Sequence, residues 1–203
     1  MSLFSTERII QMLYMLVPII LALSVHEFAH AFAADKLGDP TARVSGRMTL
    51  DPTKHLDPIG FVSLLFFGFG WARPVPFNPM NLKNRKSGTL LISLAGPLSN
   101  LILAVIFSVL LKFVIIPINN EVLTYIFYYG VIINISLMAF NLIPVPPLDG
   151  SKILASLLPD RLEMKFYQYE HYLYLLLIIL LITGIIGYIL SPIMSPFLNV
   201  LLP

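Results

Sequence analysis

The sequence has 203 residues, of which 57% are hydrophobic and only 12% are charged. A soluble globular domain usually carries about twice that share of charged residues, so the composition predicts an integral membrane protein. The formal net charge of +2, without a basic cluster interleaved with aromatic residues, argues against a nucleic-acid partner. The sequence contains no cysteine, which excludes disulfide bonds and thiolate ligands to zinc.

Four apolar segments are long enough to cross a bilayer, for which about 20 residues are needed. The first helix should end at Gly38 and Pro40, and the third at the prolines that begin with Pro144. We expect a mainly α-helical, polytopic membrane protein with one intramembrane domain over residues 1–203. Its expected spans are residues 9–35, 87–111, 122–142 and 171–190.

The connection between the first two spans, residues 41–80, has a different character. It is rich in proline and glycine and holds short β-favouring pieces, such as Thr41–Val44 and Arg73–Phe77. Residues 59–71 are apolar but too few and too rich in glycine to span. A re-entrant or interfacial segment fits better. Non-helical backbone at membrane depth needs protein or a wet cavity around it, so we expect a cavity here.

Lysine and arginine residues predict the orientation. Of the 13 in the sequence, eight lie in residues 36–86 and three in residues 144–170, which leaves only Arg8 and Lys112 for the opposite side. Cytoplasmic connections carry an excess of these residues. We therefore expect a multi-pass protein of the cell membrane, with both termini outside and both basic connections in the cytoplasm.

The first span contains the sequence His-Glu-Phe-Ala-His at residues 26–30. On a helix, His26 and His30 project from one face, one turn apart, and can bind the same metal ion. Glu27 is placed to bond a water molecule as a general base. Ionisable groups inside a span cost several kcal/mol and usually mark function. The less favoured interpretation is that the three side chains only hydrogen-bond to neighbouring helices.

A zinc hydrolase needs a third protein ligand and an open fourth position for water. The extended pattern of soluble metalloproteases fails, because Ala33 and Lys36 stand three and six residues after His30. Asp149 is the carboxylate expected at membrane depth. It is equally well explained as the N-cap of a short helix over residues 151–158, and the residue pattern leaves both interpretations open.

Other polar residues receive structural interpretations. His55 lies in a polar turn and is expected at the surface or the membrane interface. His171 opens the last span beside tyrosines and is expected in an aromatic belt. Asn100 and Asn134 are intramembrane amides, which bind helices together more often than they contact substrate.

Two motifs far apart in the sequence are His26-Glu27-Phe28-Ala29-His30 and Asn141-x-x-Pro144-x-Pro146-x-Leu148-Asp149-Gly150. Together they resemble the site-2 protease family of intramembrane zinc metalloproteases. Segments beginning at Asp57, Gly70 and Ala95 also resemble that family's recurring segments, in the same order. With no PDZ-like or nucleotide-sensing domain in the sequence, we expect a minimal core member.

The resemblance implies roles for particular residues. One Zn²⁺ per chain is held by His26, His30 and Asp149, and Glu27 is the catalytic residue. Substrate-binding residues are Asn141, which helps to hold the substrate backbone, and Gly68 and Gly70. The region around these two glycines is implied to form a small membrane-associated β-hairpin near the site.

An intramembrane zinc endopeptidase is the expected function. Its substrates would be transmembrane proteins cut within or near their spans, as in regulated intramembrane proteolysis, at a site that opens towards the cytoplasm. Strand addition to an edge in residues 66–78 is one way to hold a substrate extended. The alternatives are a membrane transporter of metal ions or protons, and a catalytically inactive scaffold of the same fold. The ligands suit zinc best, although cobalt or iron fits the same donors.

Overall fold

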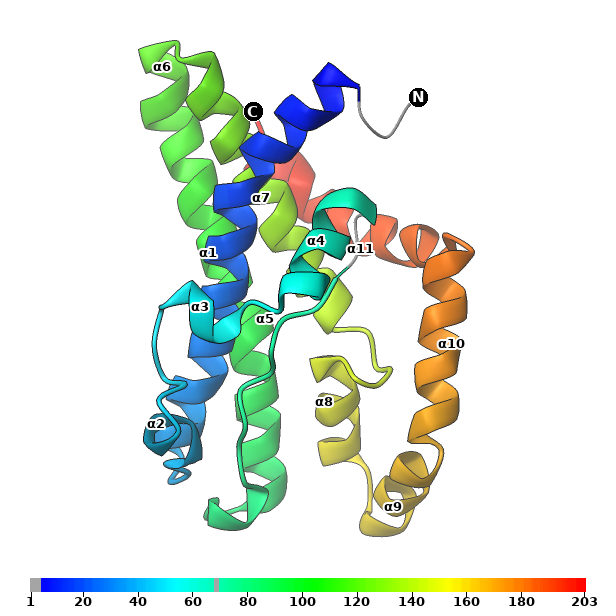
Figure 1. Cartoon of the computed structure of the whole chain (residues 1–203). Helices are drawn as coiled ribbons and strands as arrows, with labels where there is room; N and C mark the ends of the chain where they lie inside the picture. The colour runs from blue at the N-terminus through cyan, green and yellow to red at the C-terminus, as the bar shows by residue number, and fades with distance from the viewer. Residues whose placement is uncertain (1–4, 68–69) are drawn as a thin grey trace.

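The computed structural model describes residues 5–67 and 70–203. Three long helices, α1 (Thr6–Lys36), α5 (Arg85–Leu110) and α7 (Glu121–Asn141), pack against one another in every pairing (Figure 1). Each is long and apolar enough to span a membrane, so three of the predicted spans are present. Fully buried alanines, among them Ala22 and Ala104, let the helices approach closely.

The ends of these helices follow from local chemistry. Ser5 and Asn84 cap α1 and α5, their side-chain oxygens accepting hydrogen bonds from backbone N–H groups of the first turn. The helix α1 stops at Gly38, as the sequence predicts. In contrast, α5 passes its expected end at residue 111 through a π-helical turn, η2 (Leu111–Ile115), and the short helix α6 (Ile116–Ile118). Lys112 lies inside this π-helical turn, and its ammonium group donates to the Val200 carbonyl at 2.8 Å.

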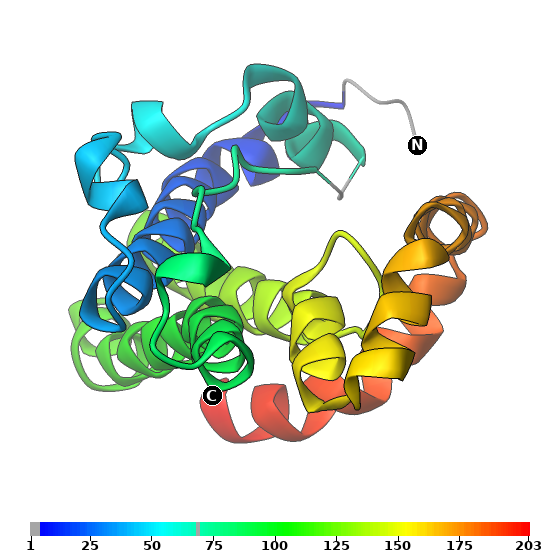
Figure 2. The same cartoon turned by 90° about the horizontal axis from the view of Figure 1, so that it is seen from below.

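The last apolar segment differs from the single span expected at residues 171–190. Two helices, α10 (Glu170–Ile182) and α11 (Ile185–Leu201), meet at a bend of 84°. Gly184 makes the bend with a φ of 73°, a left-handed conformation that glycine adopts at little cost. Figures 1 and 2 show α10 standing apart from the three long helices, with α11 returning across them. The bent pair can count as a fourth span.

The connection between α1 and α5 forms short helices, and of the two pieces expected as strands, Thr41–Val44 is helical whereas Arg73–Phe77 is neither helix nor strand. It contains α2 (Thr41–Val44), α3 (Pro52–His55) and α4 (Pro58–Phe67), and ends with the 3₁₀ turn η1 (Pro79–Asn81). The predicted β-hairpin is not borne out: no strand forms in the described residues, and a single bridge joins Leu56 to Ala72. Residues 70–78, which we call the extended segment, run back past α4 without a strand partner.

Asp39 fastens the extended segment to the end of α1. Its carboxylate is fully buried and accepts hydrogen bonds from Asn78 N at 2.6 Å, Asn81 Nδ2 at 2.7 Å and the Thr41 backbone and hydroxyl. Burial raises the pKa of Asp39, but these hydrogen bonds outweigh it and leave the pKa below its ordinary value. Asp39 is thus an ionised anchor that fixes where residues 70–81 cross α1.

Charged residues tie the start of α5 to the two helices that follow α7. These are α8 (Asp149–Leu157), which packs on α5, and α9 (Asp160–Gln168). Arg85 donates both Nη groups to the two carboxylate oxygens of Glu163, which is buried. Lys86 donates to the Leu158 carbonyl and pairs with Asp160 at 2.7 Å. This ion-pair clamp holds the far end of α8 against α5.

The clamp predicts an acid-sensitive contribution to stability. The hydrogen bond from Arg85 lowers the pKa of Glu163 below its ordinary value. The carboxylate therefore stabilises the fold at neutral pH, and this contribution is lost as the pH falls below the ordinary value of 4.5 and through the lower pKa of the folded state. We expect Glu163→Gln to lower stability at pH 7 by about 1 kcal/mol, since Arg85 is half exposed.

Thermal unfolding in detergent between pH 7 and pH 3 measures this effect. The matched control is Glu170→Gln, which replaces an exposed carboxylate. The variant Glu163→Gln should lose less stability on acidification than the unmodified chain. Equal unfolding temperatures for Glu163→Gln and the unmodified chain at pH 7 would contradict the clamp.

Candidate metal centre

Three potential metal ligands from α1 and α8 meet at one point. His26 Nε2 lies 3.0 Å from His30 Nε2, and each lies 3.1 Å from Asp149 Oδ2. Their side chains are only 8%, 12% and 9% exposed, respectively for His26, His30 and Asp149. Among the described residues, these three form the group of histidine and carboxylate side chains that could hold a metal ion.

The backbone explains how these residues meet. His26 and His30 are one turn apart on α1, as their spacing predicts. Asp149 is the first residue of α8, whose N-cap is Leu148, so the interpretation of Asp149 as an N-cap does not hold.

In each imidazole, the second ring nitrogen, Nδ1, lies within hydrogen-bond distance of a carbonyl oxygen. His26 Nδ1 lies 2.7 Å from Asn100 Oδ1, and His30 Nδ1 lies 2.7 Å from the Ile92 carbonyl. A carbonyl oxygen can only accept, so both Nδ1 atoms carry the hydrogen. In its neutral form, each ring then presents an Nε2 lone pair to Asp149. This hydrogen bonding is the usual arrangement of histidines that bind a metal.

The three facing atoms fit one zinc ion. With both rings neutral, all three are acceptors in mutual contact with no hydrogen between them, an arrangement that a cation relieves. Ligands of a tetrahedral zinc at 2.0–2.2 Å lie about 3.3 Å apart, within a few tenths of an ångström of the observed 3.0–3.1 Å. Two imidazoles and one carboxylate also match the donor set of zinc hydrolases, which leaves a fourth position open.

Glu27 lies beside the three ligands and is held by the extended segment. It is 8% exposed, and its Oε2 accepts a hydrogen bond of 2.9 Å from the backbone N–H of Val75. Val75 itself is buried against Ala31 and Ala42. The general base expected from the sequence is therefore oriented by a backbone group 48 residues away.

His55 supports the extended segment from the other side, and its expected surface position is wrong. The side chain is fully buried, and Nε2 lies 2.7 Å from the Thr49 carbonyl. The His55 carbonyl accepts a hydrogen bond from the Arg73 backbone N–H at 2.7 Å. The polar neighbours that suggested exposure lie on other sides of the short helix α3.

Two of the three proposed substrate-binding residues, Asn141 and Gly70, lie in the described part of the chain. Asn141 is half-buried and donates its side-chain amide to the Leu137 carbonyl of its own helix. Gly70 packs against α4, where an added Cβ would lie 2.7 Å from Leu64 Cβ. Gly68 falls outside the described residues. The roles of Asn141, Gly68 and Gly70 in substrate binding remain predictions.

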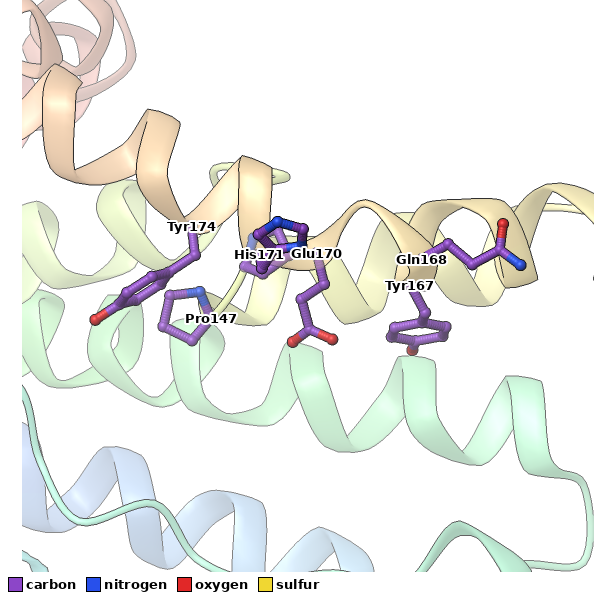
Figure 3. A pocket seen from close by; sticks show the side chains of 7 residues that line it. Pro147, Tyr167, Gln168, Glu170, His171 and Tyr174 are labelled. Atoms are coloured by element: carbon purple, nitrogen blue, oxygen red, sulfur yellow. The ribbon is translucent and has the colours of Figure 1, made fainter.

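A pocket of about 410 Å³ lies next to the segment that leads to Asp149. It is lined by Pro146, Pro147 and side chains around the start of α10, including Glu170, His171 and Tyr174 (Figure 3). The ring of His171 packs on Tyr172, with centroids 3.7 Å apart. The residues that line this pocket do not include the three ligand residues.

The chain is similar in sequence to proteins named zinc metalloproteases. A model of peptidase family M50 matches residues 115–184. A Bacillus subtilis protein named "Putative zinc metalloprotease YwhC" is 40% identical over 188 residues, 90% of this chain and 86% of the relative. "Putative zinc metalloprotease Rip2" of Mycolicibacterium smegmatis is 29% identical over 169 residues, 81% of this chain and 64% of the relative. "Zinc metalloprotease MJ0392" of Methanocaldococcus jannaschii is 29% identical over 137 residues, 68% of this chain and 32% of the relative. No solved structure matched at a significant level.

Gly96 of α5 lies against the two imidazoles, so a larger residue there should disturb zinc binding. A Cβ at this position would lie 2.6 Å from Cε1 of both His26 and His30, and closer still to His30 Nε2. We expect Gly96→Ala to displace the rings and to weaken zinc binding at least about tenfold. Competition with a chromophoric chelator measures the zinc dissociation constant.

Gly88→Ala is the matched control on the same helix. Its added Cβ would meet Leu82 Cδ1 at 2.8 Å, the flexible end of a side chain that can move aside. Zinc affinity should therefore change little in this variant. Equal zinc affinities for Gly96→Ala and Gly88→Ala would contradict the close packing of Gly96 on the metal centre.

Proposed function

The chain belongs to peptidase family M50 and is a zinc metallopeptidase, and from this premise we propose that it cleaves membrane proteins within or near their transmembrane segments. One observation carries the proposal: the three converging acceptors and Glu27 are buried on α1, a helix apolar enough to span a membrane, and on α8. Family membership sets aside the transporter as an alternative. We take residues 1–203 to act as one intramembrane domain.

Three residues hold the metal in this proposal. His26 and His30 give their Nε2 atoms and Asp149 gives Oδ2. When bound, zinc supplies Lewis acidity and lowers the pKa of water towards about 7. The hydrogen bonds from His26 to Asn100 and from His30 to the Ile92 carbonyl keep both rings in the tautomer that binds metal.

Glu27 moves the proton. It takes a proton from the attacking water and returns it to the leaving amine nitrogen. The Val75 N–H holds Oε2, so Oε1 is the oxygen left to accept the proton. A hydrogen bond from a backbone group also steadies the carboxylate without adding a competing charge.

The substrate must reach a buried site in an extended form, because a helix hides its carbonyl groups in hydrogen bonds. Strand addition along the extended segment now has less support. The Arg73 and Val75 N–H groups are bonded to His55 O and Glu27, and Arg47 donates to the Arg73 and Pro74 carbonyls. Prolines have no N–H group to offer. A substrate strand would need these bonds to open first.

The orientation is also a proposal. The start of α5, α2 and α9 lie at one end of the molecule, and α6 and the C-terminus at the other (Figure 1). The first end holds most of the lysine and arginine residues, which supports a cytoplasmic position for it and an external one for the C-terminus. We propose that the chain lies in the cell membrane with its site reached from the cytoplasm, and that lipid and transmembrane substrates are its partners.

A cleavage assay tests the proposed function. Purified chain should cleave single-span peptides, and a chelator should abolish cleavage until zinc is returned. We expect Glu27→Gln to lower the rate at least about 100-fold, the range of general base catalysis, with its zinc content unchanged. Glu7→Gln, at an exposed position of the same helix, is the matched control and should cleave normally.

Two results would refute the assignment. Cleavage that survives in Glu27→Gln would remove the role of Glu27. Cleavage that persists after the zinc content of the protein has been reduced to zero would remove the metal from the reaction.

A further inference from the structure

Two buried amides connect the metal centre to the third long helix. Asn100 lies on α5 and Asn134 on α7, and both side chains are fully buried. Asn100 Oδ1 faces His26 Nδ1 at 2.7 Å, and Asn100 Nδ2 donates to Asn134 Oδ1 at 3.0 Å. The chain of contacts therefore runs from α1 through α5 to α7, across the middle of the bundle.

Backbone carbonyls fix the direction of every bond in this chain. Asn134 Nδ2 donates to the Gly130 carbonyl at 2.8 Å, and Asn100 Nδ2 donates its second hydrogen to the Ala22 carbonyl at 3.2 Å. Because carbonyl oxygens only accept, neither amide can be turned around without placing oxygen against oxygen. Asn100 must then offer its oxygen, and not its NH₂ group, to His26.

This direction determines the state of the ligand. An oxygen at His26 Nδ1 requires a hydrogen there, and in the neutral ring this leaves Nε2 as a lone pair facing His30 and Asp149. An NH₂ group in the same place would favour the opposite tautomer, with its hydrogen pointing at the metal position. A role limited to joining helices accounts for the hydrogen bonds to the Ala22 and Gly130 carbonyls, whereas the contact of Asn100 Oδ1 with His26 Nδ1 adds a hydrogen bond to a metal ligand.

We propose that Asn100 and Asn134 form an amide relay that acts through His26 as a pair of positioning residues, holding its metal-binding tautomer and thereby setting zinc affinity. The inference rests on the proposed function, since it takes His26 as a zinc ligand. Partners of this kind change metal affinity by about 10-fold to 100-fold when they are removed.

Leucine substitutions test the relay because leucine has the same number of side-chain heavy atoms and the same branching at Cγ as asparagine, and offers no acceptor. Asn100→Leu removes the acceptor at His26 and should weaken zinc binding by about 10-fold to 100-fold. Of the hydrogen bonds that Asn100 makes, Asn134→Leu removes only the one to Asn134, and the Asn100 amide still donates to the Ala22 carbonyl. The loss of zinc affinity should therefore be smaller, at most about tenfold.

Ser108→Ala is the matched control for loss of a buried hydrogen bond on the same helix. Ser108 is buried on α5 and donates to the Leu201 carbonyl of α11, away from the metal centre. Ser108→Ala should lower the unfolding temperature of the zinc-free chain without changing zinc affinity. The two leucine variants should change both.

The experiment is a zinc competition titration with a chromophoric chelator on the full chain in detergent, with thermal unfolding of the zinc-free forms beside it. We expect Ser108→Ala to bind zinc as tightly as the unmodified chain. Asn134→Leu should bind zinc more weakly, and Asn100→Leu should bind it most weakly. Asn134→Leu keeps the test valid if Asn100→Leu does not fold. Leucine variants that unfold earlier but bind zinc as tightly as the unmodified chain would overturn the relay and leave the amides as helix contacts.

His26→Ala separates this failure from failure of the proposed function. If the unmodified chain binds zinc and His26→Ala does not, the metal centre stands and only the relay is at issue. If zinc binding does not depend on His26, the metal assignment and the relay both fall.

Discussion

The metal centre depends on keeping three hydrogen-bond acceptors, His26 Nε2, His30 Nε2 and Asp149 Oδ2, within 3.1 Å of one another inside an apolar bundle. Acceptors without hydrogens between them repel, and burying a carboxylate among them adds a desolvation cost. A bound cation reverses both effects. The surrounding packing must still hold the three side chains in place, since donor atoms spread over two helices do not converge unless those helices are fixed.

Contacts around the centre supply that restraint from several directions. Gly96 lets α5 approach the imidazoles closely, and the clamp of Arg85 and Lys86 on Glu163 and Asp160 holds α8 against the same helix. On the opposite side, Asp39 and His55 set the path of the extended segment, whose Val75 orients Glu27. The polar groups inside the bundle therefore form connected sets and not isolated pairs, in keeping with the high cost of an unpaired polar group there.

Much of this was accessible from the sequence because it depends on short spacing or on composition. The i and i+4 positions of His26 and His30, the three apolar helices and the stop at Gly38 all follow from neighbouring residues. The rest depends on distant contacts. Asp149 could be an N-cap or a metal ligand until its distance to His30, which lies 119 residues earlier in the sequence, was known. The bend at Gly184 lies within an unbroken apolar run, so hydropathy does not mark it. His55 and the direction of the Asn100 amide are decided by backbone carbonyls that no local pattern reveals.

The position of the bound metal tests directly whether His26, His30 and Asp149 hold one zinc ion. Crystals of the full chain grown with zinc, measured with X-rays on both sides of the zinc absorption edge, give an anomalous map that shows zinc alone. The account predicts one strong peak about 2.0–2.2 Å from each of His26 Nε2, His30 Nε2 and Asp149 Oδ2. A peak bound by the two histidines with the Asp149 carboxylate turned away, or a peak elsewhere in the chain, would contradict it.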